Sequence, residues 1–297
     1  MYDFIIVGAG SAGCVLANRL SSNPQTKVLL LEAGTQRLPK ESRIPAAFSK
    51  LFHSAADWNY FTEAEPAAAD RRMYWPRGKM LGGCSAMNAM MYVRGHASDY
   101  DQWRQLGNIG WGFDDVLPYF KRSERFAGTG AADGYHGTDG ELAISDQRSP
   151  NPIAHAFVDA GSSLGLPRRI DINGAEQDGI GLTHVTQRNG ARASAADAFL
   201  TPARKRPNLR IETGVLVQKV VVEGGRAVGV SYRQGETTVA ARMHARGVAV
   251  GGCHWLAPAS HAVRHWTGGG VEVSRHRGAS ESEGRSAAIC RITCQSA

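Results

Sequence analysis

Residues 3–34 form the stretch DFIIVGAGSAGCVLANRLSSNPQTKVLLLEAG, in which two apolar runs flank a glycine-rich turn and a helical pattern. The first run, Asp3–Val7, stops at glycines, and apolar residues then recur at helical spacing over Ala12–Leu20. A second run, Lys27–Leu31, follows a polar break. A strand, a helix and a strand within about 32 residues have the length of a βαβ unit with two parallel strands. The stretch therefore predicts an α/β fold with a parallel sheet.

Three glycines lie between the first predicted strand and its helix in the pattern G-x-G-x-x-G. Gly8 permits a tight turn, Gly10 lets a pyrophosphate approach the backbone, and Gly13 allows the helix and the strand to pack closely. Ser11 lies at the helix N-terminus, where free N–H groups and the helix dipole favour phosphate groups. These four residues are therefore predicted to bind a dinucleotide. The alternative is a glycine-rich turn in an unrelated α/β protein.

An acidic residue, Glu32, ends the second predicted strand, 19 residues after Gly13. A carboxylate at this point is placed to accept hydrogen bonds from ribose hydroxyl groups. It also disfavours a 2′-phosphate, which argues against NADP. The βαβ unit alone leaves FAD and NAD as alternatives.

A longer motif at residues 77–101, RGKMLGGCSAMNAMMYVRGHASDYD, distinguishes between these cofactors. It resembles the first signature of the glucose-methanol-choline (GMC) oxidoreductases, which are choline-dehydrogenase-like flavoenzymes. A glycine pair followed by small residues provides backbone that can lie against a flat ring and donate N–H groups to its polar edge. The resemblance implies FAD as the cofactor, bound by residues of this loop. The predicted contacts are Leu81, Gly82, Gly83, Asn88, Ala89, Met90 and Met91.

Further segments extend the resemblance from Met1 to about Arg246. They are YHGTDGEL (135–142), QRNGARASAADAFLTP (187–202) and Val217, which matches the family position whose backbone holds the adenine. The resemblance implies a Rossmann-like FAD-binding domain with a parallel sheet and antiparallel strands over 1–250, with elements of an incomplete substrate domain around 151–190. His136 and His184 are expected to be hydrogen-bonded histidines at the surface or beside a site, rather than catalysts, and Arg192 and Ser194 to organise a turn.

The remaining elements follow from local patterns. Residues 35–75 lack periodicity and carry several prolines, which predicts irregular structure at the surface. Helices are predicted over 99–105, 113–122 and 151–164, and strands over 209–221 and 227–232, with a tight turn at Gly224 and Gly225.

The C-terminal stretch departs from the family pattern after about Val250. It holds four of the ten histidines and three of the five cysteines, which first suggests a zinc site. However, a shift of one nucleotide, with suitable codons, turns Cys253–Trp266 into AIGSPQLLMLSGI, a segment that the family carries here. We therefore predict that residues 251–297 form an aberrant, disordered tail, translated out of frame by a natural or a sequencing event, and that they form no metal site.

The resemblance implies that an alcohol is oxidised to an aldehyde by hydride transfer to flavin N5, and it leaves the electron acceptor open. Family members take the catalytic base from the C-terminal part, so no catalytic residue is predicted here and the chain is expected to be inactive. Two alternatives are an NAD-linked dehydrogenase and a non-catalytic nucleotide-binding module with a genuine metal- or partner-binding tail.

Composition limits the other classes. The net charge of +7 is spread over the chain without a dense Lys/Arg run, which argues against a nucleic-acid partner. No apolar run of about 18 residues occurs, so neither a membrane span nor a signal peptide is expected, and a cytoplasmic location is the default.

Overall fold

The computed structural model describes residues 1–130, 134–224, 226–244 and 248–250, the last three for their backbone alone. The chain divides into two compact units. The first contains Met1–Leu38, Lys79–Gly83 and the described residues from Leu200 onward, and the second contains Pro39–Gly78 and Cys84–Phe199. The predicted out-of-frame tail, 251–297, lies outside the described residues.

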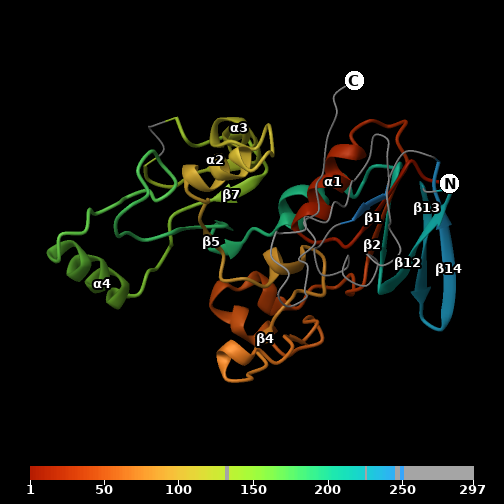
Figure 1. Cartoon of the computed structure of the whole chain (residues 1–297), viewed down its shortest axis with the longest axis horizontal. Helices are drawn as coiled ribbons and strands as arrows, with labels where there is room; N and C mark the ends of the chain where they lie inside the picture. The colour runs from red at the N-terminus through yellow and green to blue at the C-terminus, as the bar shows by residue number, and fades with distance from the viewer. Residues whose placement is uncertain (131–133, 225, 245–247, 251–297) are drawn as a thin grey trace. The chain divides into compact units, whose positions relative to one another are not determined.

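The first unit contains a parallel sheet built from the βαβ stretch. Its strands are β1 (Phe4–Val7), β2 (Val28–Glu32), β11 (Leu209–Thr213) and β15 (Val248–Val250), and the helix α1 (Ser11–Leu20) connects β1 to β2. The strand order is β11-β2-β1-β15, and every neighbouring pair is parallel. Helix α1 packs against β1 and β2 (Figure 1). The predicted α/β fold with a parallel sheet is confirmed.

An antiparallel sheet completes this unit. It consists of β12 (Val215–Glu223), β13 (Arg226–Gln234) and β14 (Thr237–Arg242), in that order. A short helix, α5 (Thr201–Ala203), precedes β11 of the parallel sheet. The pattern over 209–221 predicted continuous β-structure, but Gly214 divides it between the two sheets. Gly214 adopts a left-handed φ of +70°, and its N–H donates to the Gly34 carbonyl at 2.8 Å. A glycine tolerates this conformation, so the chain can turn from one sheet to the other.

The core of the first unit lies between these two sheets. Alternate side chains of β1 and β2 meet apolar side chains of β12, β13 and β14. The cluster consists of Ile5, Val7, Leu29, Leu31, Val215, Val217, Val230, Tyr232, Ala241 and Met243. Because parallel strands are covered on both faces, β2 is buried at every position.

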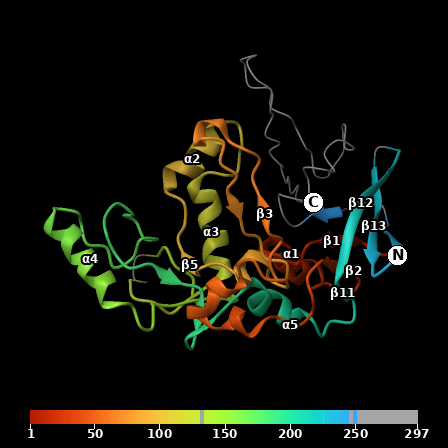
Figure 2. The same cartoon turned by 90° about the horizontal axis from the view of Figure 1, so that it is seen from below.

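The second unit contains three helices, α2 (Ala97–Gln105), α3 (Phe113–Ser123) and α4 (Pro152–Ser163). Helices α2 and α3 lie side by side (Figure 2). Each of the three predicted helices is present, and each starts at a cap. The Asn151 side chain accepts from the Ile153 N–H at 3.0 Å, and the Asp115 carboxylate accepts from the Gly112 N–H at 3.0 Å. Capping of this kind satisfies N–H groups that the first helical turn leaves without partners.

The strands of the second unit are short and paired in twos. Three of these pairs are antiparallel: β3 (Tyr60–Phe61) with β4 (Tyr74–Trp75), β5 (Met91–Tyr92) with β8 (His184–Val185), and β9 (Gln187–Arg188) with β10 (Ala191–Arg192). The fourth pair, β6 (Glu124–Phe126) with β7 (Leu142–Ile144), is parallel. Tight helical turns occur at η1 (Lys40–Arg43), η2 (Pro45–Leu51) and η3 (Pro66–Ala68). The chain passes between the units within η4 (Gly83–Ala86) and the π-helical η6 (Ala196–Leu200).

Candidate functional site

The three glycines of the first turn have different surroundings. A Cβ atom on Gly13 would lie 1.9 Å from the Gly8 carbonyl oxygen, so Gly13 is required for packing. Gly8 has a left-handed φ of +90°, and its N–H donates to the Leu31 carbonyl at 2.7 Å. A Cβ atom on Gly10, by contrast, would meet no atom of the described residues within 4 Å. The chain's own packing therefore does not require glycine at position 10, and open space lies beside that residue.

Helix α1 begins at this open space without a side-chain cap. Gly10 is its N-cap residue with φ −73°, no side chain caps the helix, and no acidic residue lies in its first turn. Ser11, the first helical residue, is exposed. The partial positive charge of a helix N-terminus attracts anions when no acidic side chain occupies it. This geometry suits a phosphate group.

Glu32 is buried, with 5% of its surface exposed, at the carboxyl end of β2. Its Oε2 accepts from the Ala9 N–H and its Oε1 from the Gly34 N–H, both at 2.8 Å. Burial raises the pKa of Glu32, although hydrogen bonds from Gly34 and Ala9 oppose that shift. Glu32 thus holds the glycine turn in shape, a role that its position in the motif did not predict. The predicted bond to a ribose hydroxyl remains a prediction.

The segment Lys79–Gly83 packs directly on the glycine turn within the first unit. The Gly82 N–H donates to the Ala9 carbonyl at 2.7 Å, and a Cβ atom on Gly83 would lie 2.7 Å from the Gly10 Cα atom. The two glycine loops can approach this closely only because neither carries a side chain at the contact. The structure therefore brings together eight of the predicted residues: Gly8, Gly10, Ser11, Gly13, Glu32, Leu81, Gly82 and Gly83.

Val217 lies on β12 of the same unit. Its side chain is buried in the apolar core, and its backbone pairs with Tyr232 of β13. The register of this pair shifts between Val217 and Lys219, so one residue of β12 is left out of the ladder. Such a bulge locally disrupts ladder bonding. The predicted contact of Val217 with an adenine can therefore involve only its backbone.

The remaining predicted residues, 88–91, belong to the second unit. Asn88 is exposed, Ala89 is half-buried, Met90 is buried and Met91 has 64% of its surface exposed. Met90 has a left-handed φ of +64°, an uncommon conformation for a residue with a side chain. The Met90 carbonyl accepts from the Thr186 N–H at 2.9 Å, and Met91 pairs with Val185. These contacts fix the segment within its own unit.

A buried network of charged residues in the second unit was not predicted. The Arg94 Nη2 atom lies 2.6 Å from the Glu124 Oε2 atom, and the Glu124 Oε1 atom lies 2.8 Å from the His136 Nδ1 atom. The His136 Nε2 atom lies 2.6 Å from the Asp171 Oδ2 atom, whose carboxylate also lies 3.6 Å from the His184 Nδ1 atom. His136 and His184 are both buried, so neither lies at the surface, and their non-catalytic role stays a prediction.

The two carboxylates determine the charge of His136. Each ring nitrogen faces a carboxylate, so both nitrogens must donate, and the ring carries a positive charge. Burial lowers the pKa of His136, but the hydrogen bonds to Asp171 and Glu124 outweigh it and raise the pKa to about 9. The only sequence signal for this network is the YHG triplet, which does not reveal the distant partners.

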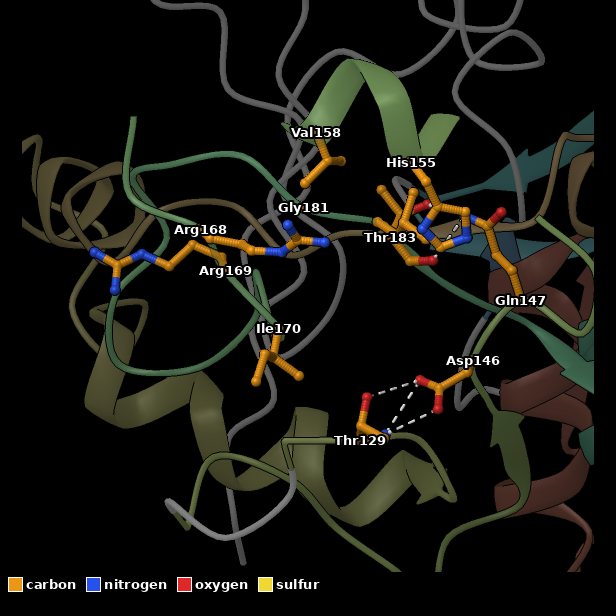
Figure 3. A pocket seen from close by; sticks show the side chains of 11 residues that line it. Thr129, Asp146, Gln147, His155, Val158, Arg168, Arg169, Ile170, Gly181 and Thr183 are labelled. Carbon is orange, nitrogen blue, oxygen red and sulfur yellow. Dashed lines mark hydrogen bonds between the residues drawn. The ribbon is translucent and has the colours of Figure 1, made fainter. Parts of the chain in front are cut away.

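A pocket of about 210 Å³ lies in the second unit, and none of the predicted cofactor residues lines it (Figure 3). Charged residues on its wall already have partners. Arg168 pairs with Asp159 at 2.6 Å, Arg169 pairs with Glu176 at 2.5 Å, and Asp146 accepts from the Thr129 N–H at 3.1 Å. The pocket is lined by Thr129, Asp146, Gln147, His155, Val158, Arg168, Arg169, Ile170, Gly181, Leu182 and Thr183. It offers polar groups without an unpaired arginine, and it overlaps the predicted substrate-domain segment.

The described part of the chain contains neither a cluster of metal ligands nor a membrane-spanning helix. No group of three or more His, Cys, Asp or Glu side chains there is arranged to hold a metal ion. Among the helices described, none has both the length and the apolar character needed to cross a bilayer.

Comparison with known families decides which flavoprotein class this geometry represents. The profile of the GMC oxidoreductases matches residues 2–258. The chain belongs to the GMC oxidoreductase family. Members of this family are FAD-dependent oxidoreductases, so FAD is the cofactor that membership assigns.

Individual relatives agree with this assignment. The chain is 47% identical over 240 residues to an uncharacterised GMC-type oxidoreductase of Mycobacterium tuberculosis (80% of this chain, 45% of the relative). It is 46% identical over 234 residues to an oxygen-dependent choline dehydrogenase of Vibrio vulnificus, covering 78% of this chain and 41% of the relative. An alcohol dehydrogenase (acceptor) of Pseudomonas putida is 46% identical over 235 residues, with 79% and 42% covered.

A solved structure shares the fold. The crystal structure of pyridoxine 4-oxidase from Mesorbium loti superposes with a TM-score of 0.80 at 38% identity, over 84% of this chain and 49% of that one. The chain thus spans somewhat less than half the length of the curated relatives that it matches.

Proposed function

We propose that this chain binds FAD at the glycine turn of the first unit and corresponds to the cofactor-binding part of an enzyme that oxidises an alcohol. The open space beside Gly10 supports this proposal most strongly. Gly13 is glycine because the fold leaves no room for a Cβ atom, whereas the fold itself leaves room at Gly10. A glycine that packing does not require, at an uncapped helix N-terminus, is explained by a ligand that approaches the backbone.

Each predicted residue then has a physical task. The N–H groups at the start of α1 bind the pyrophosphate, and Glu32 accepts from the ribose while holding Ala9. Leu81–Gly83 and 88–91 contact the flavin ring, and the Val217 backbone contacts the adenine. When bound, FAD supplies hydride acceptance from the carbon that carries the hydroxyl group.

An alcohol is the proposed substrate class because the named relatives act on choline and on alcohols. The reaction also needs a base to accept the hydroxyl proton. None of the histidines before residue 250 matches the family motif for that base. The chain aligns with only 41 to 45% of the length of these relatives. We therefore expect this polypeptide to bind FAD but to catalyse little or no alcohol-dependent reduction of a dye.

The experiment compares cofactors directly. The purified chain is incubated separately with FAD, NAD⁺ and NADP⁺, passed through a desalting column and examined for co-eluting nucleotide. FAD alone should co-elute, with its yellow absorbance, and choline or simple alcohols should not bleach it at an enzymatic rate. Retention of NAD⁺ in place of FAD would favour the NAD-linked alternative, and robust turnover would refute the expected inactivity.

A further inference from the structure

Arg192, on β10 of the second unit, is a buried cation without a carboxylate partner. Only 4% of its surface is exposed, and no described carboxylate lies within ion-pair distance of its guanidinium group. Arg94, the other buried arginine of this unit, differs because it pairs with Glu124 at 2.6 Å. Burial lowers the pKa of Arg192 to about 10, and the negative charge of Asp197 opposes that shift. Burying a charge without a counter-ion is costly, so a specific role is needed to explain it.

The Arg192 guanidinium is bonded instead to four neutral oxygen atoms. Its Nε donates to the Ser42 carbonyl at 2.7 Å, and its Nη1 donates to the Ser85 carbonyl at 3.1 Å. Its other two bonds go to Asn88, from Nη1 to the side-chain Oδ1 at 2.8 Å and from Nη2 to the carbonyl at 2.6 Å. The planar fork of an arginine can reach several acceptors that lie at fixed angles, which a lysine cannot do.

Three of these four oxygens belong to the turn that leads into the predicted flavin segment. The N–H groups of Met87 and Asn88 both donate to the Cys84 carbonyl, at 3.1 and 2.9 Å, which closes the turn. At the end of a helical turn the following carbonyl groups lack partners within the turn. Arg192 supplies donors to those of Ser85 and Asn88. A second tie comes from the Ala195 N–H, which donates to the Ser85 Oγ at 2.9 Å.

Asn88 passes this restraint on to Met90. The Asn88 Oδ1 atom accepts from Arg192 and also from the Met90 N–H at 3.1 Å. Met90 is held in a left-handed conformation, φ +64°, which costs about 1–3 kcal/mol and persists only where surrounding contacts enforce it. Such strain occurs preferentially at binding sites. The bond from Met90 to Asn88, which Arg192 holds, is one of the contacts on this residue, beside the bond from Thr186.

We propose that Arg192 is a positioning residue for FAD binding, which acts through Asn88 to hold residues 88–91 in the conformation that contacts the flavin. This inference rests on the proposed function. It assigns to the QRNGARASAADAFLTP motif a task beyond forming a turn. Because Arg192 is bonded to Ser85 and Asn88, its loss should change the cofactor affinity through the backbone order of the segment.

The test measures amide hydrogen exchange by mass spectrometry and FAD affinity by titration on the same variants. Arg192→Met removes all donors, and Arg192→Lys keeps the charge without the fork. Arg206→Met is the matched control because Arg206 donates to Asn18 and Ser21 in the first unit. Peptides from 142–163 serve as an internal reference for general loosening of the second unit.

We expect exchange over residues 84–91 to rise about tenfold in Arg192→Met and less in Arg192→Lys, with the reference peptides unchanged. FAD affinity should fall about 10- to 100-fold in Arg192→Met. Arg206→Met should leave exchange at 84–91 as in the wild type. Unchanged exchange at 84–91 in Arg192→Met, or an equal rise throughout the second unit, would overturn the inference. If the wild-type chain does not bind FAD, the proposed function is wrong, and so is the role of Arg192 in FAD binding. The exchange comparison still decides whether Arg192 holds residues 88–91 in place.

Discussion

The two units of this chain are stabilised by different means. The first unit has a cluster of apolar side chains between two sheets and glycine loops in backbone contact. In the second unit, the fully buried side chains include Glu124 and His184, which belong to a network of alternating charges. The first arrangement tolerates no added atoms at its close contacts. The second depends on every charged partner remaining in place and in its proper ionisation state.

Loss of one network carboxylate should give the largest effect. Glu124→Leu leaves Arg94 and His136 buried without their shared partner. Breaking a buried ion pair from one side costs about 3–5 kcal/mol. We expect the free energy of unfolding of the second unit to fall by that amount, measured by hydrogen exchange at peptides from 92–188.

Asp159→Ala is the control for this variant because it breaks an exposed pair with Arg168. Exposed pairs contribute about 1 kcal/mol or less. Equal losses of unfolding free energy in the two variants would mean that the buried network stabilises the second unit no more than an exposed ion pair does.

An added methyl group at Gly13 should give the next largest effect, in the first unit. Its Cβ atom would lie 1.9 Å from the Gly8 oxygen, so the helix must move away from the strand. Overpacking of this kind costs about 2–3 kcal/mol. Chemical denaturation of Gly13→Ala followed by circular dichroism should show this loss. A stability equal to that of the wild type would show that the helix and the strand are not in close contact.

Raising the pH should weaken the second unit selectively. His136 has a pKa raised from 6.5 to about 9 in the folded chain, so its stabilising contribution is fully present below about pH 6.5. The contribution is lost as the pH rises through about 9, and it amounts to at most about 3 kcal/mol.

Urea titrations between about pH 6 and pH 9.5 should show this decline, and the slope should vanish in His136→Gln. A wild-type stability that stays constant over this range, or a decline that persists in His136→Gln, would show that His136 is not the titrating group.

The sequence predicts the first unit better than the second, for a physical reason. The βαβ stretch is local, so apolar periodicity and three glycines reveal its strands, its helix and its loop. Gly214 was not recognised as a division between two sheets because its left-handed conformation leaves no mark in an alternating apolar pattern. The charged network joins residues far apart in the chain, such as Arg94 with Glu124 and His136 with Asp171. No local pattern reports such pairings, and the same holds for Arg192 and Asn88.

The central claim is that Gly10 is glycine to admit FAD, and Gly10→Ala tests it most directly. The added Cβ atom meets nothing within 4 Å among the residues that the structure describes, so the variant should lose only about 1 kcal/mol or less, through the weaker helix cap. FAD titrations of the wild type and the variant, followed by quenching of flavin fluorescence, should show an affinity at least about 100-fold lower in Gly10→Ala, a difference of about 2.7 kcal/mol. Equal FAD affinities in a variant that folds normally would contradict the claim.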